Sequence, residues 1–356
     1  MASAQALSGN TVSIAATNVG YHDFKINDAV NLHLYSSQLE PWYFSIPMMQ
    51  ALPKLIKQAD IVHLHGIWDY PCLAAALICR PFKVPYVISP HGMLDPWSLS
   101  QNRWKKAFYL FLFGQTMVDG AKRVHFTSEG ERSRCALPIA LAKTFVAPLG
   151  LSKTTCRDLP APRAFEDQFP RLKDARIILF LARIHPIKGL DILLPAIAEL
   201  LKKHEEWVLV LAGGGENGYI NVVKEQIKSL GLEKSVLMTG HVHGEVKTSL
   251  LKLAKVFVLP SHSENFGVSV IEAMQAGLPV VISDQIAIAA DVLKYQAGLV
   301  FALDPDDIRE KVEKVITDTD LQRKLGSNGK RLVGEVYDWD KITPRQIEIY
   351  QTILNQ

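Results

Sequence analysis

Short runs of aliphatic, often β-branched residues alternate along this chain with longer amphipathic stretches. The segments TVSIAA, IVHLHG and RVHFTS in the first half, and RIILFLAR and WVLVLA in the second, are examples, and each half holds about six such runs. Nearly continuous apolar strands that alternate with helices are typical of parallel sheets covered by helices on both faces. The sequence therefore predicts an α/β fold with two doubly wound domains.

The boundary between the two predicted domains lies in a segment without helical or strand periodicity. Residues 149–175 are rich in proline and charged side chains, which is typical of a linker. At 356 residues the chain has the length of two ordinary domains. We therefore expect a first domain over residues 1–150 and a second over residues 151–337.

Charge and cysteine content exclude several classes of protein. The net charge of +3 is too small to indicate a nucleic-acid partner. The cysteines lack the spacing of a disulfide framework, which suits a reducing compartment; they are Cys72, Cys79, Cys135 and Cys156. The first residues lack the basic and apolar parts of a secretory signal, and the longest apolar stretch is too short to span a bilayer. A cytoplasmic location is therefore expected.

The segment SENFGVSVIEAM combines a predicted helix start with two carboxylates. The strand VFVLPS ends before it, and we expect a helix to begin near Gly267. Unpaired N–H groups at a helix start attract anions; here they belong to Asn265, Phe266, Gly267 and Val268. A phosphate there and a ribose at Glu272, about 8 Å further along, would fit the helical rise, with Glu264 on the other side of the phosphate. The alternative is a capping carboxylate and an ordinary helical glutamate.

Two cations follow the strand RIILFLAR. Arg183 ends this run, and Lys188 with Gly189 opens the next helical pattern. Arginine and lysine at a strand end can hold a diphosphate, the arginine through two hydrogen bonds and the lysine as a point charge. Two solvated charges in a loop are the alternative, which is less favoured when a second anion-type helix start lies in the same domain.

The segment LAGGGENGY matches the dinucleotide pattern G-x-G-x-x-G through Gly213, Gly215 and Gly218. The match follows the second predicted strand of its domain rather than the first, and a lone match is weak. We therefore favour a turn at which a nucleotide or sugar approaches the backbone over a dinucleotide site.

Histidines lie at the ends of predicted strands in the first domain. His91 precedes Gly92 after the strand YVIS, where it can bind a hydroxyl or carry a proton, or can be an ordinary loop histidine. His63 and His65 lie on one face of the strand IVHLH. Without a third ligand in register, packing is favoured there over a metal site.

Two further clusters resemble binding motifs but favour structural roles. Asp304, with Pro305 and the aspartates after it, fits a helix cap better than a metal site. Residues 101–113, QNRWKKAFYLFLF, combine cations with an aromatic run. They can form a helix that rests on an anionic membrane, or a partly buried helix with a basic end, which is the favoured interpretation.

Several motifs together resemble one family, the retaining glycosyltransferases of family 4. They are FLARIHPIKGLDIL, LAGGGENGY, LPSHSENFGVSVIEAMQAGLPVV and the ending YDWDKI, while HGMLDPWSL and FTSEGE resemble members that build bacterial surface polysaccharides. The resemblance implies a GT-B fold with two Rossmann-like domains facing across a cleft. It also implies that the last helix, residues 338–356, returns to the first, acceptor-side domain, and that the second binds the nucleotide-sugar.

The resemblance assigns roles to individual residues. Arg183 and Lys188 would hold the donor diphosphate, Glu272 the ribose and Glu264 the transferred sugar, with His91 near the reacting carbon. The backbone of Asn265, Phe266, Gly267 and Val268 would meet sugar hydroxyls and phosphate. The base would lie near the turns after Gly213 and Gly240, and its contacts would include Gly213, Gly215, His241 and Val242. The family needs no metal or other cofactor, so none is expected.

The implied activity is transfer of a hexose from a UDP- or GDP-sugar to a glycan or lipid-linked glycan in exopolysaccharide assembly, with peripheral contact with the inner membrane. One departure is that MASAQALSGNTVSIAATN resembles the end of the family's first helix and its second strand, without the first strand and glycine-rich loop. This leaves two alternatives: a nucleotide-sugar-binding protein with little activity, or a GT-B-fold epimerase. The sequence does not specify the base, the sugar, the acceptor or the linkage.

Overall fold

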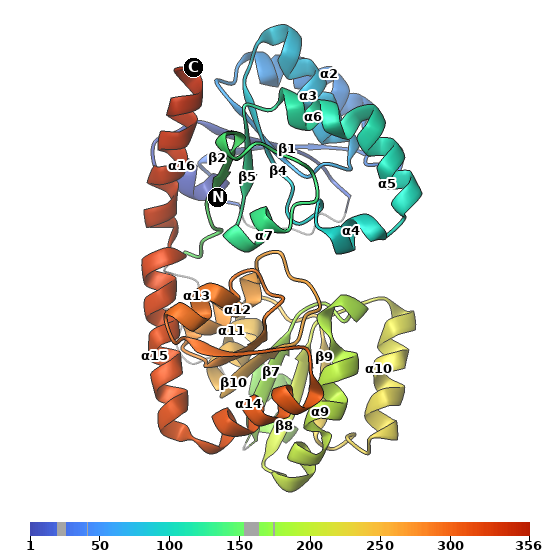
Figure 1. The fold of residues 1–356 in the computed structure, drawn as a ribbon, viewed down its shortest axis with the longest axis vertical. Coiled ribbons are helices and arrows are strands. Elements are labelled where there is room, and N and C mark those ends of the chain that lie inside the picture. Colours follow the sequence, from blue (N-terminus) through green and yellow to red (C-terminus); the bar gives the residue numbers. More distant parts are fainter. Residues whose placement is uncertain (20–25, 41, 153–163, 174) are drawn as a thin grey trace. The chain divides into compact units, whose positions relative to one another are not determined.

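The computed structural model of the protein describes residues 1–19, 26–40, 42–152, 164–173 and 175–356, and part of the predicted linker, with Cys156, lies outside this range. The chain forms two compact units (Figure 1). Unit 1 comprises Met1–Gly150 and Trp339–Gln356, and unit 2 comprises Leu151–Asp338. Asp338 forms a bridge with Leu151, so unit 1 resumes at Trp339 rather than at residue 338.

Unit 2 is built on one six-stranded parallel sheet. Its strands are β7 (Arg176–Leu181), β8 (Trp207–Ala212), β9 (Val236–Gly240), β10 (Val256–Leu259), β11 (Val280–Ser283) and β12 (Gly298–Phe301). Their order across the sheet is β12-β11-β10-β7-β8-β9. The chain thus builds one side of β7 and then returns to the other side with β10, which is the predicted doubly wound arrangement.

Helices cover both faces of this sheet, which is why β8, β10 and β11 are buried along their whole length. The helices are α8 (Ala164–Gln168), α9 (Leu190–Lys203), α10 (Asn217–Ser229), α11 (Gly244–Leu253), α12 (Val268–Ala276), α13 (Ala289–Lys294), α14 (Pro305–Thr317) and α15 (Thr319–Val336). α9 packs beside α10 and α14, whereas α12 packs beside α11 and α15. Asp304 caps α14 by accepting from the N–H groups of Asp306 and Asp307, and Pro305 follows it, so the predicted cap is confirmed.

Unit 1 contains six parallel strands in two separate sheets. β1 (Val12–Thr17) pairs with β2 (Val30–Tyr35), while β3 (Val62–His65), β4 (Tyr86–Ser89), β5 (Arg123–Phe126) and β6 (Thr144–Val146) pair in chain order. The parallel strands expected for this unit are therefore present, but they form two sheets, because none of the described strands bridges β1 and β3.

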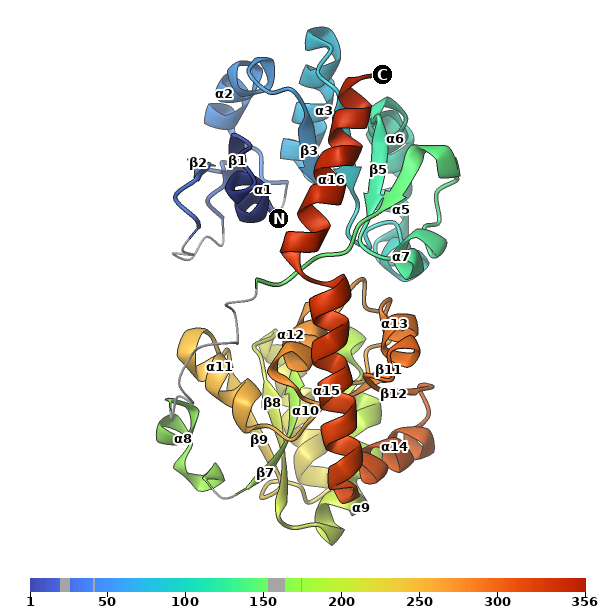
Figure 2. The ribbon, with the colours of Figure 1, turned by 90° about the vertical axis from the view of Figure 1, so that its left-hand side faces the viewer.

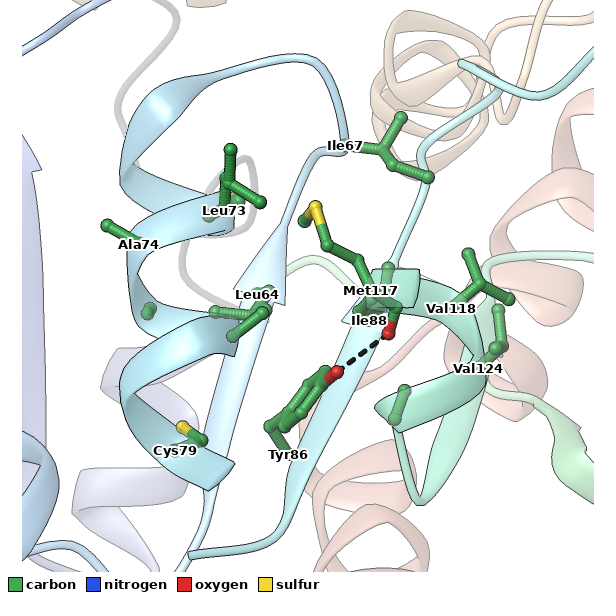
Figure 3. Close-up of a cluster of buried hydrophobic side chains, with 14 of the residues drawn as sticks. Leu64, Ile67, Leu73, Ala74, Cys79, Tyr86, Ile88, Met117, Val118 and Val124 are labelled. Carbon is green, nitrogen blue, oxygen red and sulfur yellow. Dashed lines mark hydrogen bonds between the residues drawn. The ribbon is translucent and has the colours of Figure 1, made fainter. Parts of the chain in front are cut away.

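The helices of unit 1 pack around a core on the four-stranded sheet (Figure 3). They are α1 (Ala2–Leu7), α2 (Ile46–Lys57), α3 (Tyr70–Phe82), α4 (Pro96–Ser100), α5 (Arg103–Tyr109), the π-helical η1 (Leu110–Gly114), α6 (Gln115–Gly120), α7 (Glu129–Ser133) and α16 (Trp339–Leu354). Tyr86 is 2% exposed in this core, and its hydroxyl donates to the carbonyl of Met117 at 2.8 Å. This bond joins β4 to α6 and satisfies the buried hydroxyl.

The last helix, α16, is part of unit 1 although it follows unit 2 in the chain. It packs beside α1 (Figure 2). The hydroxyl of Tyr350 on α16 lies 2.5 Å from Nδ1 of His63 on β3. The C-terminal helix α16 therefore contacts both the N-terminal helix α1 and β3, the first strand of the four-stranded sheet.

The segment of residues 101–113 is a partly buried helical segment, as the favoured interpretation predicts. Tyr109 is 8% exposed and Phe113 packs against the core, whereas Trp104 is 86%, Phe108 66% and Phe111 82% exposed. One apolar side of α5 and η1 therefore faces outward. Among the described residues, none of the helices combines the length and apolar character that crossing a bilayer requires.

Candidate functional site

The ends of β7 and β10 lie side by side in the middle of the unit 2 sheet. β7 pairs with β8 on one side and with β10 on the other, which is where the strand order reverses. In open parallel sheets of this kind, ligands bind beyond the carboxyl ends of the strands at the reversal. Arg183 and Lys188 follow β7 and Glu264 follows β10, so three predicted site residues occupy this position.

Lys188 and Glu264 form an ion pair between these two strand ends. The lysine ends the short 3-10 turn Pro186–Lys188, and its side chain is 13% exposed, against 19% for the glutamate. Gly189 has φ +72°, and a Cβ at this position would lie 2.0 Å from the carbonyl oxygen of Pro260. Only glycine therefore lets the two loops approach closely enough for the pair to form.

Arg183 is the second cation at this place and is exposed. No carboxylate of the described residues lies within ion-pair distance of its guanidinium, whereas Lys188 is paired. Burial and then the charge of Arg183 lower the pKa of the nearby His185. The end of β7 therefore presents one open cation beside one paired cation, a combination that can accept a ligand with two negative groups.

The start of α12 is the anion-type helix terminus that the sequence predicts. Gly267 is its N-cap with φ +87°, and the helix begins at Val268. Phe266 is 3% exposed and packs edge-on against Tyr337, with ring centroids 5.6 Å apart. Its side chain is therefore part of the core, and its backbone N–H group is the part of Phe266 that can contact a ligand at this helix start.

Glu272 lies on α12 and pairs with a lysine that the sequence analysis did not select. The Nζ of Lys247, on α11, lies 2.6 Å from Oε1 of Glu272. The glutamate side chain is 12% exposed and the lysine side chain 31%. No short motif connects these two residues in the sequence, so their contact follows only from the packing of α11 beside α12.

The glycines after β8 are required by the neighbouring backbone. A Cβ at Gly213 would lie 1.9 Å from the carbonyl oxygen of Ala182, and one at Gly215 would lie 2.1 Å from that of Ile184. Gly218 has open space around it inside α10, so it makes no close helix contact. This favours a tight turn over a dinucleotide fingerprint. His241 is exposed and Val242 half-buried beside this turn.

His91, the site residue predicted in unit 1, forms a pair with His65. Its Nε2 lies 2.9 Å from Nδ1 of His65 at the end of β3, and the two rings stack with centroids 5.2 Å apart. Burial lowers the pKa of both histidines, and the charge of a protonated His91 lowers that of His65 further. One neutral ring thus donates to the other. The described residues contain no group of three or more His, Cys, Asp or Glu that could hold a metal ion.

A chain of hydrogen bonds runs from the backbone of residue 147 to α16. Nε2 of His125 lies 2.7 Å from the carbonyl oxygen of Ala147, which can only accept, so this nitrogen carries the proton. Nδ1 of His125 then accepts from Ser89 Oγ at 2.7 Å, and Ser89 accepts from Nε2 of His63 at 2.6 Å. Nδ1 of His63 is left to accept from the hydroxyl of Tyr350.

This series of hydrogen bonds requires neutral histidines, and burial keeps the histidines neutral by lowering their pKa values. Burial lowers the pKa of His125 to about 4, although the bond to the Ala147 carbonyl opposes this shift. Burial also lowers the pKa of His63 well below its usual value, with further contributions from His65 and His125. The interpretation of His63 as a packed residue thus agrees with the structure, which adds a defined tautomer.

The turn that carries His91 is held by a buried carboxylate. Glu131 is 4% exposed, and it accepts from the N–H of Gly92 at 2.7 Å and from the N–H and hydroxyl of Thr127 at 2.6 and 2.7 Å. Burial raises its pKa, although these hydrogen bonds oppose the shift. Ser128 caps α7 by accepting from the N–H of Glu131, so the S-x-x-E pattern of a capping box was the signal that could have singled it out.

Two family models match this chain. Residues 1–150 match the glycosyl transferase 4-like domain, and residues 163–332 match the glycosyl transferases group 1. The two matched ranges follow each other with a short interval, and each lies within one of the units described above.

Individual relatives agree with these matches. An uncharacterized glycosyltransferase of Methanocaldococcus jannaschii is 31% identical over 180 residues, which cover 50% of this chain and 45% of the relative. The GDP-mannose:cellobiosyl-diphosphopolyprenol alpha-mannosyltransferase of Xanthomonas campestris is 26% identical over 317 residues, or 86% of this chain and 78% of the relative. The chain thus spans less than half the length of the first of these relatives.

Solved structures show the same fold. The Anabaena protein HepE in complex with UDP and glucose is similar with a TM-score of 0.74 and 18% identity, and the match covers 91% of this chain and 87% of HepE. This similarity confirms the predicted GT-B fold class. Residues 1–150 match the glycosyl transferase 4-like domain and residues 163–332 the glycosyl transferases group 1, so each of the two units is similar to glycosyl transferases.

Proposed function

We propose that this protein transfers a hexose from a nucleotide-sugar to a glycan or lipid-linked glycan. The observation that carries the proposal is the group of Arg183, Lys188 and Glu264 at the strand reversal of unit 2, next to the helix start at Gly267. An open cation, a cation with an exchangeable partner and a helix N-terminus are together suited to a diphosphate.

Donor binding would begin with an exchange of partners at Lys188. The diphosphate would take the place of the Glu264 carboxylate on the lysine and form a bidentate contact with Arg183. Glu264 would then accept hydrogen bonds from hydroxyls of the transferred sugar. The backbone of residues 265–268 would meet the remaining phosphate oxygens, and Glu272 would accept from the ribose.

The reaction would break the bond between the anomeric carbon and the diphosphate oxygen and form one between that carbon and the acceptor oxygen. Negative charge develops on the leaving diphosphate, and Arg183, Lys188 and the α12 terminus would stabilise it without a metal. In the retaining mechanism that we propose, the acceptor hydroxyl attacks from the face of the leaving group and gives its proton to the leaving phosphate. Neither glutamate is needed as a nucleophile. His91 remains a predicted contact of the sugar.

The donor base is either uracil or guanine in this proposal. The Xanthomonas relative is named for GDP-mannose, and HepE was solved with UDP and glucose. A thermal-shift series with UDP, GDP, ADP and their sugars distinguishes the bases, because a ligand present at a hundred times its Kd stabilises the folded state by about 2.7 kcal/mol. A shift with UDP or GDP is expected, and no shift with any of them would contradict the proposal.

The acceptor is proposed to be lipid-linked, in the assembly of a surface polysaccharide at a membrane. The support is the Xanthomonas relative, whose name specifies a diphosphopolyprenol acceptor and which matches 86% of this chain. Radiolabelled sugar transfer to a polyprenyl-diphosphate glycan tests this directly.

The decisive test of the reaction compares variants of the donor site. Lys188→Ala and Glu272→Ala are expected to lower sugar transfer by at least about tenfold, since each removes a charge-assisted contact. Lys234→Ala, which changes an exposed lysine of the same unit, is the matched control and keeps wild-type transfer. Transfer at the wild-type rate in both site variants would contradict the proposed function.

A further inference from the structure

The exposed aromatic residues of α5 and η1 form one continuous stripe. Its members recur at the spacing of one helix face and are 86, 66, 82 and 42% exposed; they are Trp104, Phe108, Phe111 and Leu112. We call this set the 104–112 stripe. In Figure 1, α5 lies at the outer edge of unit 1. Single exposed apolar residues are ordinary, but a contiguous exposed stripe marks an interaction surface.

Cations flank the 104–112 stripe, and carboxylates are absent from it. Arg103 and Lys105 are exposed on either side of Trp104, and neither forms an ion pair with a described residue. Between Pro96 and Val118 the sequence contains three cations and no aspartate or glutamate. These three positive charges equal the net charge of +3 of the whole chain, so the remaining residues together carry no net charge.

The third cation of this segment, Lys106, lies on the inner side of the helix and contacts the rest of unit 1. The Nζ of Lys106 donates to the carbonyl of Ser98 and lies 5.4 Å from the ring centre of Trp68. Tyr109 is buried and contacts the rings of Trp68 and Phe113, at 5.6 Å each between centroids. The helix is thus anchored to unit 1 by its inner side, while its outer side is left to a partner.

We infer that the 104–112 stripe is a docking surface for an anionic lipid bilayer. A helix that carries Trp and Phe on one side and Lys or Arg beside them lies in the plane of the membrane interface, with its rings at the acyl boundary. The flanking cations then meet lipid phosphates and anionic headgroups. The inference rests on the proposed function only for the lipid-linked acceptor, which would share this surface.

A second copy of this chain fits the stripe less well than a bilayer does. A two-fold contact would place Arg103 and Lys105 next to their own equivalents, with no carboxylate in the segment to separate them. Like charges at an interface oppose association. An anionic bilayer has the opposite charge and is flat on the scale of a helix. It can therefore contact the rings through its acyl chains and the cations through its headgroups at the same time.

Vesicle flotation of the full chain tests the inference without any sugar transfer. The protein is expected to float with vesicles of phosphatidylcholine and phosphatidylglycerol, and to bind vesicles of phosphatidylcholine alone much more weakly. Arg103→Gln with Lys105→Gln is expected to lower the partition coefficient about thirtyfold, because each cation near an anionic surface contributes about 1 kcal/mol. Phe108→Ser with Phe111→Ser is expected to lower it at least about tenfold.

Control variants remove exposed apolar side chains and exposed cations elsewhere in the protein. Val222→Ser with Leu293→Ser removes two side chains of 58 and 57% exposure from unit 2 and should leave vesicle binding unchanged. Lys234→Gln with Lys255→Gln does the same for two exposed cations. Equal binding by the Phe108/Phe111 variant and its control would overturn the inference. So would a wild-type dimer in sedimentation that is lost in the Phe108/Phe111 variant, since a second copy would then occupy the stripe.

Flotation also separates this inference from the proposed function. If the protein floats with anionic vesicles but shows no sugar transfer, the docking surface stands and the proposed activity fails. If transfer to a short water-soluble acceptor is normal and no vesicle binding occurs, the activity stands and the docking surface fails.

Discussion

Lys188 and Glu264 are 76 residues apart in the sequence and form an ion pair where β7 and β10 end side by side. A ligand with negative charge at this place competes with Glu264 for the lysine. The carboxylate therefore holds the cation in position and at the same time weakens the binding of an anion. Substitution of the lysine and substitution of the glutamate should therefore change the affinity for an anionic ligand in opposite directions.

Glu264→Gln is expected to bind free UDP or GDP about fivefold more tightly than the wild type, since the diphosphate no longer displaces a carboxylate from Lys188. Lys188→Ala is expected to bind at least about tenfold more weakly, because it loses a charge-assisted contact. Isothermal titration calorimetry measures both, with Lys234→Ala as the control. Equal affinities in the two site variants would show that the pair is remote from the diphosphate.

Glu272 is expected to recognise the ribose rather than the phosphates. The wild type should bind a 2′-deoxy or 3′-deoxy nucleoside diphosphate about tenfold more weakly than the ribonucleotide, since a hydrogen bond to a carboxylate is lost. In Glu272→Ala the two ligands should bind alike. Calorimetry with each pair of ligands checks this. A discrimination that survives in Glu272→Ala would assign the ribose to another residue.

Acid is expected to destabilise unit 1 through the buried histidines. The pKa of His125 is about 4 in the folded protein and about 6.5 when unfolded, so the folded state binds fewer protons between these values. The stability from this group is present above about pH 6.5 and is lost as the pH falls toward 4. The loss amounts to about 3 kcal/mol for His125, and His63 adds to it.

Urea unfolding at a series of pH values measures this loss. His125→Gln should lower the slope of stability against pH by close to one proton, while the matched change at the exposed His243 should leave it unchanged. A wild-type slope in His125→Gln would mean that other groups cause the acid sensitivity.

Glu131→Gln is expected to lower the free energy of unfolding by about 1–3 kcal/mol. The new amide nitrogen would face either the N–H of Gly92 or the donors of Thr127, so at least one buried donor would lose its acceptor. The exposed Glu129, whose side chain is 69% exposed, provides the matched variant Glu129→Gln, with little expected effect. Urea denaturation compares them, and equal midpoints would contradict the role assigned to Glu131.

Local patterns in the sequence predicted much of the fold. The apolar runs coincide with β7 to β12 and with β1 to β6. The clearest runs belong to β4, β8, β10 and β11, because strands that are buried on both faces are apolar throughout. Glycine and proline predicted the starts of α12 and α14. Gly267 adopts the positive φ of the cap before α12, and Pro305 has the fixed φ that suits the first position of a helix. The division of the first six strands into two sheets was not predictable, since apolar runs indicate strands and not their partners.

A site residue was predictable from the sequence where it directly follows a strand or begins a helix, because the end of that element then fixes its position in the fold. Arg183 and Lys188 follow β7 directly, and so the end of one strand positions both. Lys247 beside Glu272, and Tyr350 beside His63, depend on contacts between distant elements, which no spacing in the sequence records. The outward direction of the rings of Trp104, Phe108 and Phe111 was not predictable, because an apolar helix face fits a protein core and a membrane surface equally well.

The hydrogen-bonded chain from Ala147 to Tyr350 has a consequence for how unit 1 can change by mutation. Its direction is set by a backbone carbonyl, which is present whatever side chain residue 147 carries. Substitutions at Ser89, His63 or Tyr350 can interrupt the chain, but none of them can reverse it. The four side chains therefore have one permitted orientation as a set, and a replacement at one position must keep the donor or acceptor role that the carbonyl assigns to it.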